Sequence, residues 1–212
     1  MSTLLIRLAA PLQAWGESAR FNLRPTQPTP TKSGVLGMVC AAMGIPRSDI
    51  TTLEKLNELK FGVRTDRPGR LLIDFHTVSH VVNAEGKTPQ ETTITDRYYL
   101  ADAVFLVGLE GADLQLLESI HAALLKPRWL LFLGRKSCMP SDLPWLQDGL
   151  KDTDLITALS NYPPLRPDCE PSNLLELEDK VSGKPRMDTP LTFDRRKYAP
   201  RFVQTVPMKE EV

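Results

Sequence analysis

The sequence predicts a mixed α+β fold, because strand-like and helix-like segments alternate along its first 134 residues. The strand-like segments are short apolar runs, and the helix-like segments repeat their apolar residues at helical spacing. Hydrophobic residues make up 42% of the 212, which is enough to fill a core. No apolar run reaches the roughly 18 residues of a membrane span, and three distant cysteines do not indicate a disulfide framework. We therefore expect a cytoplasmic protein without a membrane partner.

The first predicted elements are a strand, a long loop and a short helix. Residues 3–9, "TLLIRLA", form the strand, and a proline-rich loop continues through Pro30. Residues 33–43 predict a helix that is apolar on nearly every side and therefore buried. Within this helix, Gly34 and Gly37 lie three positions apart and would let another backbone come close.

Two strands and a polar excursion follow. The strands are "FGVRT" (61–65) and "LLIDFHTV" (71–78), joined by residues 66–70, whose Asp, Pro and Gly favour a turn. Residues 80–94 are polar and weakly patterned, which predicts a flexible excursion or a hairpin.

A strand, a helix and a further strand complete the first part. Residues 98–109 resume as a strand, and residues 112–125 repeat leucine at helical spacing, which predicts an amphipathic helix. The run "WLLFLG" (129–134) predicts a buried strand. The order is that of a ferredoxin-like βαββαβ body with an inserted excursion.

The remainder of the chain predicts a smaller, less regular unit. Residues 141–150 and 152–159 each open with a residue that caps helices, and residues 163–190 are rich in proline and charge without strong periodicity. We divide the chain into a body at 1–140 and a helical or irregular C-terminal subdomain at 141–212, packed on that body.

Basic residues are unevenly distributed along a chain whose formal net charge is zero. Residues 18–48, 119–141 and 195–209 contain no Asp or Glu, yet they hold 13 of the 26 Lys and Arg residues. These are Arg20, Arg24, Lys32, Arg47, Lys126, Arg128, Arg135, Lys136, Arg195, Arg196, Lys197, Arg201 and Lys209. Such segregation permits a basic face that binds phosphates, although chance clustering in loops would give the same pattern.

The helix start "PTPTKSG" (28–34) resembles a phosphate seat but not a nucleotide-hydrolysing one. A P-loop needs glycines whose N–H groups wrap the phosphates, and Pro28 and Pro30 stand where those glycines would be. Histidines and cysteines show no metal-ligand spacing either. We therefore expect no nucleotide, metal or other cofactor.

Metal-independent RNA cleavage is the enzyme alternative. It needs a base, a proton donor and a cation, and three sets of residues offer those groups. They are His76, Tyr98 or Tyr99, and Lys126 or Lys136. Buried tyrosines and surface lysines would account for the same residues.

The strongest binding signal is "LKPRWLLFLGRKSC" (125–138). Gly134 would let the backbone approach a ligand, and Arg135, Lys136 and Ser137 follow with two cations and a hydroxyl. Such a group suits a phosphodiester chain, because several phosphates can be met in series. An ordinary glycine turn with solvated charges is the alternative.

Six stretches of the chain resemble the CasD family, RAMP-type subunits of the type I-E CRISPR Cascade complex. These are "LLIRLAAPLQAWG", "PTKSGVLGMVCAAMGIPR", "DFHTV", "ETTITDRYYLADAVF", "LKPRWLLFLGRKSC" and "ALSNYPPL". They span most of the first 165 residues in the family's order, whereas the last 47 residues match only loosely.

The resemblance implies a non-catalytic RNA-binding subunit in antiviral defence. Members of the family hold the 5′ handle of the CRISPR RNA (crRNA), cap a filament of backbone subunits and contact the large subunit that reads target DNA. Their ferredoxin-like (RRM-like) body carries a hairpin thumb, which by match is about 79–96 here. Trp15 would either stack on a base or fill the core.

By this resemblance and the charge pattern, twelve residues are candidates for RNA binding. They are Gln13, Trp15, Arg24, Lys32, Ser33, Gly34, Arg97, Arg128, Gly134, Arg135, Lys136 and Ser137. A subunit that cuts precursor RNA is the runner-up, and a protein scaffold without RNA would leave the acid-free segments unexplained.

Overall fold

The computed structural model describes residues 1–17, 22–80, 82, 86, 92–179 and 182–208. Its main feature is a seven-stranded sheet in the order β10-β11-β9-β4-β7-β1-β8, with every neighbouring pair antiparallel. The strands are β1 (Ser2–Ala9), β4 (Lys60–Arg67), β7 (Val104–Gly111), β8 (Leu150–Lys151), β9 (Leu174–Asp179), β10 (Lys184–Thr192) and β11 (Lys197–Pro207). The mixed α+β class predicted from the sequence is confirmed.

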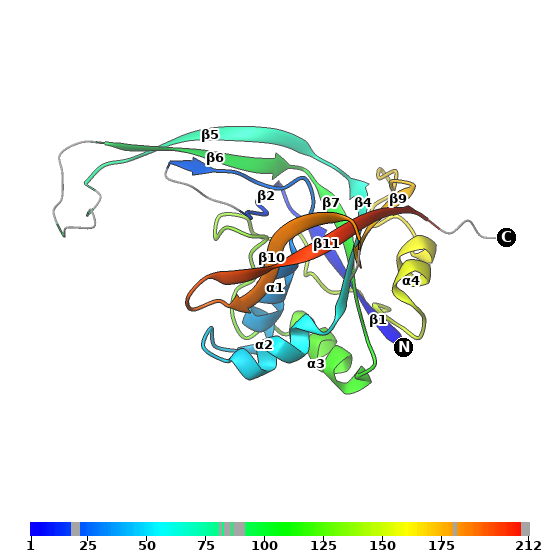
Figure 1. Cartoon of the computed structure of the whole chain (residues 1–212). Coiled ribbons are helices and arrows are strands. Elements are labelled where there is room, and N and C mark those ends of the chain that lie inside the picture. Colours follow the sequence, from blue (N-terminus) through cyan, green and yellow to red (C-terminus); the bar gives the residue numbers. More distant parts are fainter. Residues whose placement is uncertain (18–21, 81, 83–85, 87–91, 180–181, 209–212) are drawn as a thin grey trace.

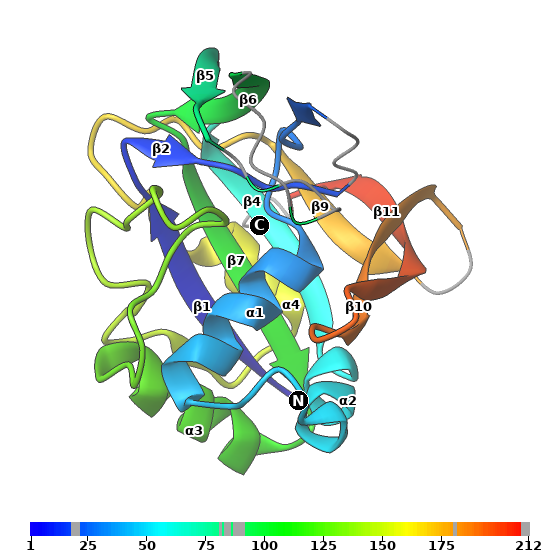
Figure 2. The same ribbon diagram turned by 90° about the vertical axis from the view of Figure 1, so that its left-hand side faces the viewer.

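Four helices in the described residues cover the two faces of this sheet (Figure 2). They are α1 (Lys32–Met43), α2 (Ile50–Asn57), α3 (Leu114–Leu125) and α4 (Leu155–Asn161). The period of two along β1 sends Leu4 and Ile6 into the core under α1 and α3, and Leu5 into a second core under α4. Both faces are therefore apolar, which explains why β1 is apolar at nearly every position.

A second, smaller sheet rises from one end of the body. Its strands are β2 (Leu12–Gln13), β3 (Leu23–Arg24), β5 (Arg70–Val78) and β6 (Thr93–Ala101). β5 and β6 pair over their full length and form a long arm that extends beyond the body (Figure 1). The predicted excursion at 80–94 falls mostly on residues outside the described ones, as does half of the thumb predicted at 79–96, and from Thr93 on both belong to β6.

The helix predictions are confirmed at α1, α3 and α4, and each of these helices begins at a predicted type of cap. Thr31, Asp113 and Asp154 accept a hydrogen bond from a backbone N–H three residues later. The sequence analysis missed α2, which Asp49 caps in the same way. In the described part of the chain, none of the helices combines the length and apolar character that crossing a bilayer requires.

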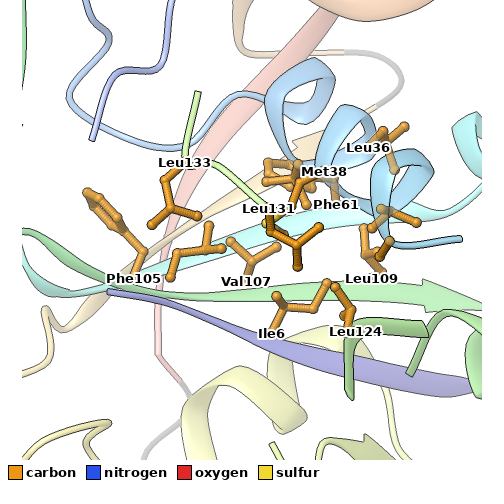
Figure 3. Close-up of a cluster of buried hydrophobic side chains, with 14 of the residues drawn as sticks. Ile6, Leu36, Met38, Phe61, Phe105, Val107, Leu109, Leu124, Leu131 and Leu133 are labelled. Atoms are coloured by element: carbon orange, nitrogen blue, oxygen red, sulfur yellow. The ribbon is translucent and has the colours of Figure 1, made fainter. Parts of the chain in front are cut away.

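The predicted strand at 129–134 is wrong, because its backbone bonds to a helix end and a turn. The N–H groups of Arg128 and Trp129 donate to the last carbonyls of α1, at Ala42 and Ala41. Leu131 and Leu133 still enter the core (Figure 3), so the apolar run is explained by burial alone. The edge of the sheet next to β1 is taken instead by the two-residue strand β8.

The region after residue 140 also differs from its prediction. No helix forms at 141–150, where Ser141 donates its N–H to Ala9 and Pro144 has none to offer. The prediction of an irregular tail is wrong as well. β9, β10 and β11 are strands that extend the main sheet through β4. Their alternation is interrupted by proline and charge, which hid it in the sequence.

The predicted strand at 98–109 is split into β6 and β7 at Asp102, whose φ is 58°.

Candidate functional site

The start of α1, expected to seat a phosphate, already holds a carboxylate of the chain itself. The backbone N–H of Lys32 donates to Asp188 Oδ2 at 2.9 Å. Asp188 is fully buried and bound by Arg201 through two hydrogen bonds of 2.8 and 2.7 Å. A helix N-terminus attracts anions, and here β10 supplies the anion.

The Lys32 side chain is a buried structural group, so its predicted contact with phosphate is wrong. Its Nζ donates to the carbonyls of Asn57 and Leu59, both at 2.9 Å, and to Glu178 at 2.8 Å. Only 1% of the residue is exposed. Burial lowers the pKa of Lys32, and the neighbouring Glu178 carboxylate partly offsets that effect.

Gln13 and Trp15 are also core residues and do not offer their side chains to a ligand. The Gln13 amide donates to the carbonyl of Ala103 at 2.7 Å, and its oxygen accepts from Trp15 Nε1 at 3.1 Å. Gln13 is fully buried and Trp15 is 1% exposed. Of the two expectations for Trp15, filling the core is therefore the correct one.

Gly34 and Gly134 serve close approach within the chain. A Cβ on Gly34 would lie 2.9 Å from the Trp15 ring, and a Cβ on Gly134 would lie 1.8 Å from the Ala14 carbonyl oxygen. Gly134 also has a φ of 95°, which favours glycine. Gly134 was expected to let a ligand come close to the backbone. In the structure it lets the backbone at Ala14 come close instead.

Arg135 joins the loop that follows Gly134 to the small sheet. Its guanidinium donates to the carbonyls of Tyr98 at 3.0 Å and Arg24 at 2.6 Å, and it lies 4.6 Å above the centre of the Tyr99 ring. Arg135 is half-buried, so its charge remains at the surface. Arg24 pairs in register with Arg97 between β3 and β6.

Two adjoining cavities form a groove that runs along α1 and past its C-terminal end, which we call the basic groove. The larger cavity has a volume of about 600 Å³ and the smaller about 280 Å³, and both are lined by Ser33, Gly34, Gly134 and Tyr198. Five cations line the groove, namely Arg24, Arg47, Arg135, Lys136 and Arg196. Among the described residues that line it there is no Asp or Glu.

The basic groove brings together the three acid-free segments of the sequence. Arg24 and Arg47 come from 18–48, Arg135 and Lys136 from 119–141, and Arg196 from 195–209. The turn between β10 and β11 carries Arg196 to the groove. The segregation of charge along the chain therefore does produce a basic surface in space.

Six of the twelve candidate residues line the groove and are at least partly exposed. They are Arg24, Ser33, Gly34, Gly134, Arg135 and Lys136. Three candidates lie outside it. Arg97 donates to Thr95 Oγ1 on β6, the Arg128 side chain covers Gly44 at the far end of α1, and Ser137 lies next to Cys138.

Among the groove residues that were not selected from the sequence are two cations and two aromatic residues. Arg47 and Arg196 were counted in acid-free segments but not selected, and Phe193 and Tyr198 belong to the tail that was expected to be irregular. The acid-free segments were the signal that could have selected the two arginines. Nothing in the spacing of Phe193 and Tyr198 points to a site.

The candidate groups for RNA cleavage are dispersed. His76 is on β5 with its Nδ1 3.7 Å from Asp74, Tyr99 is buried under Arg135, and Lys126 ends α3. Of these groups only Lys136 lines the basic groove. The three cysteines are free and buried, and the described residues contain no His, Cys, Asp and Glu cluster suited to a metal ion.

Comparisons with known proteins identify the relatives of this chain. Residues 3–204 match the family described as "CRISPR-associated protein (Cas_Cas5)". The CRISPR system Cascade subunit CasD of Escherichia coli (strain K12) is 35% identical to this chain. The alignment covers 94% of this chain and 93% of that protein.

Two solved structures have the same fold. One, described as "Crystal structure of Cas protein", is 43% identical with a TM-score of 0.79, covering 97% of this chain and 94% of the other. The second, described as "CRISPR RNA-guided surveillance complex", is 35% identical with a TM-score of 0.80, covering 97% and 90%.

Proposed function

Because the chain belongs to the Cas5 family of CRISPR-associated proteins, we propose that it is an RNA-binding structural subunit of a Cascade surveillance complex and holds the 5′ handle of crRNA. The observation that carries this proposal is the basic groove. Five cations surround one continuous hollow without a carboxylate among its described lining residues, and phosphates of a nucleic acid chain are the ligands that such a surface prefers.

The sheet topology supports a ferredoxin-like RAMP body as the frame of this site. Along the chain, β1, α1, β4, β7, α3 and β8 follow the βαββαβ order, with the strands arranged as β4-β7-β1-β8. The basic groove lies along α1, at the end of the body from which the small sheet rises. We assign the thumb to the arm of β5 and β6 together with the residues around 79–96 that join these strands.

The arm also has the surface expected of a contact with neighbouring subunits. Leu71, Ile73 and Phe75 alternate along β5, so they share one face, and they are 61%, 57% and 65% exposed. Exposed apolar patches of this kind mark protein interfaces. This supports a role in capping the backbone filament and contacting the large subunit, with target DNA met only through the complex.

RNA cleavage finds less support than RNA binding. General base catalysis most often uses an imidazole or a carboxylate within hydrogen-bond reach of the reacting hydroxyl. The described residues that line the basic groove include neither group. The lining therefore suits a subunit that grips RNA and leaves it intact.

The test replaces three exposed cations of the groove by glutamine, in the variant Arg47→Gln/Lys136→Gln/Arg196→Gln. A matched control removes the same charge from exposed sites elsewhere, in Lys55→Gln/Lys126→Gln/Arg195→Gln. Arg195 and Arg196 are neighbours, and only Arg196 lines the groove. Binding of a single-stranded crRNA handle is measured by fluorescence anisotropy at several salt concentrations.

We expect the groove variant to bind at least tenfold more weakly and to reduce the slope of log K against log salt by about 2, since each lost phosphate contact on a single strand contributes about 0.7. The control should stay within about twofold of the wild type. Equal weakening of both variants would mean that the RNA responds to net charge and not to the groove.

A further inference from the structure

We infer that Trp129 is a stacking platform for one unpaired base of the RNA whose phosphates lie in the basic groove. The inference rests on the proposed function, since it takes RNA as the ligand of that groove. It assigns base contact to a residue of the irregular segment 127–138, in place of the buried Trp15.

Trp129 stands between the basic groove and a second cavity. This second cavity, the apolar cleft, has a volume of about 460 Å³. Most of its lining residues are apolar, among them Pro127, Met139, Pro140 and Leu143, and it is also lined by Arg128, Ser141 and Asp142. Trp129 and its neighbour Leu130 line both hollows. Because Trp129 lines both hollows, its ring is the surface that we assign to a base turning from the groove toward the apolar cleft.

The exposure of the ring distinguishes Trp129 from the other two tryptophans. Trp129 is 49% exposed, whereas Trp15 is 1% exposed and Trp145 packs beside the His121 ring with centroids 5.4 Å apart. Trp129 belongs to none of the described hydrophobic core clusters. A large apolar ring with half of its surface in water gains free energy when a flat apolar partner covers it.

The backbone beneath the ring is held in place. Trp129 N–H donates to the carbonyl of Ala41, and Arg128 N–H donates to that of Ala42 at 2.9 Å. These bonds attach the segment to the end of α1, the same helix that lines the groove. A fixed platform loses little entropy on binding, so more of the stacking free energy contributes to affinity.

The larger cavity combines this ring with charges that reach the sugar–phosphate chain. Arg47, Lys136 and Arg196 line it together with Trp129. Aromatic rings interleaved with cations bind single-stranded nucleic acid, because unpaired bases can stack while the backbone is neutralised. A duplex keeps its bases inside, so the inference predicts a preference for single-stranded RNA.

The experiment compares Trp129→Ala and Trp129→Phe with the matched control Leu130→Ala, all in the full-length chain. Leu130 is 72% exposed and lines the same two hollows, so its truncation removes apolar surface without removing a π-face. Three probes are titrated: an unstructured single-stranded RNA, the same RNA with one abasic site moved along it, and inorganic polyphosphate, which carries no base.

We expect Trp129→Ala to weaken binding of the intact RNA by about 5- to 100-fold, the range for loss of one stacked base. Trp129→Phe should recover most of the affinity, and Leu130→Ala should lie within about threefold of the wild type. Polyphosphate should bind all variants equally. One abasic position should weaken wild-type binding but add nothing to Trp129→Ala, because the same contact is then already lost.

Tryptophan fluorescence gives a readout that a structural role would not change. Intact RNA should quench the wild-type emission through the exposed indole, and Trp129→Phe should remove that quenching. The stacking assignment is overturned if Leu130→Ala is as harmful as Trp129→Ala, if polyphosphate binding falls in parallel, or if no abasic position shows coupling.

The two proposals fail in different ways. If the groove variant loses RNA while Trp129→Ala binds as the wild type does, the groove binds phosphate and the stacking assignment is wrong. If the wild type binds no RNA in a salt-dependent manner, the proposed function itself is wrong.

Discussion

Four charged side chains, three of them buried and Glu178 half-buried, join the start of α1 to the last three strands. Lys32 is paired with Glu178 on β9, and Asp188 on β10 is paired with Arg201 on β11. The Lys32 backbone links the two pairs through its bond to Asp188. Each charge keeps a partner of opposite sign, so removal of one leaves another unpaired in a low-dielectric interior, which is strongly unfavourable.

Replacement of Lys32 by Met should therefore reduce stability and leave the phosphate contacts of the folded protein in place. We expect a loss of about 3 kcal/mol in the free energy of unfolding by urea, since Glu178 loses its cation and two carbonyls lose their donor. Lys126→Met, at an exposed site, should change it by less than about 0.5 kcal/mol. A Lys32→Met protein of unchanged stability but a reduced salt slope for RNA would restore Lys32 as a phosphate ligand.

The Cys40 thiol in α1 should make stability depend on pH in the alkaline range. Burial raises the pKa of Cys40 to about 11, with a contribution from Asp49, against 9.0 for an unperturbed thiol. The folded chain thus keeps a proton that the unfolded chain releases, so this contribution is complete below about pH 9 and is lost as the pH rises to about 11.

Cys40→Ala should therefore lose less stability than the wild type between pH 9 and pH 11, with a difference of about 2 kcal/mol at the upper end. Urea unfolding at a series of pH values measures it. Parallel curves for the two proteins would show that the thiol does not titrate differently on folding.

At the scale of elements, the segment 127–138 does most to shape the site although it is neither helix nor strand. Its start is bonded to the end of α1, and its Leu133 carbonyl accepts from Ala14 N–H at 3.1 Å, next to β2. Gly134 makes the second contact possible, because any side chain there would collide with the Ala14 carbonyl.

Gly134→Ala should destabilise the chain by more than about 2 kcal/mol, because it adds that collision to the backbone strain of a positive φ. Gly86→Ala is the matched control. Its φ is also positive, at 77°, but no described atom lies within 4 Å of the added Cβ. The control should lose about 1 kcal/mol in urea unfolding. Similar losses for both would mean that strain alone, without the contact to Ala14, governs Gly134.

What the sequence predicts among these elements depends on how local the determining interactions are. The leucine spacing of α3 is local, and that helix was predicted correctly from it. Of the two predicted helix caps, the one that opens 141–150 is wrong, and the one that opens 152–159 is followed by α4, which Asp154 caps. The run at 129–134 has a strand's composition, but its hydrogen-bond partners are Ala41 and Ala14, far away along the chain. Lys32 looked like an anion ligand because its partner Glu178 lies 146 residues further on. The segregation of charge along the chain predicted the groove correctly. It can be read from the sequence without knowing which residues contact one another in the fold.

At the scale of the whole molecule, β9, β10 and β11 are part of the main sheet and not an appendage. β9 pairs with β4, its Leu175 and Leu177 belong to the core under α4, and the turn after β10 completes the groove. The loose family resemblance of the last 47 residues therefore does not mark them as dispensable.

A chain that ends at residue 173 should accordingly fail to unfold cooperatively on heating, as followed by circular dichroism. It lacks Glu178 and Asp188, leaves the side chain and backbone N–H of Lys32 without these partners, and opens one side of the second core. These losses compare in size with the total stability of about 5–15 kcal/mol of an ordinary domain. A chain that ends at Met208 keeps every described strand and should melt as the full-length protein does. A cooperative transition of the shorter chain near the full-length Tm would support an independent body at 1–140.

The origin of the groove in three distant stretches of chain has a consequence for timing during synthesis. Arg24 is made early, Arg135 and Lys136 follow past the middle, and Arg196 and Tyr198 emerge among the last residues. A ribosome-bound intermediate thus has only parts of the basic groove. Under the proposed function, only a nearly finished polypeptide binds RNA at full affinity.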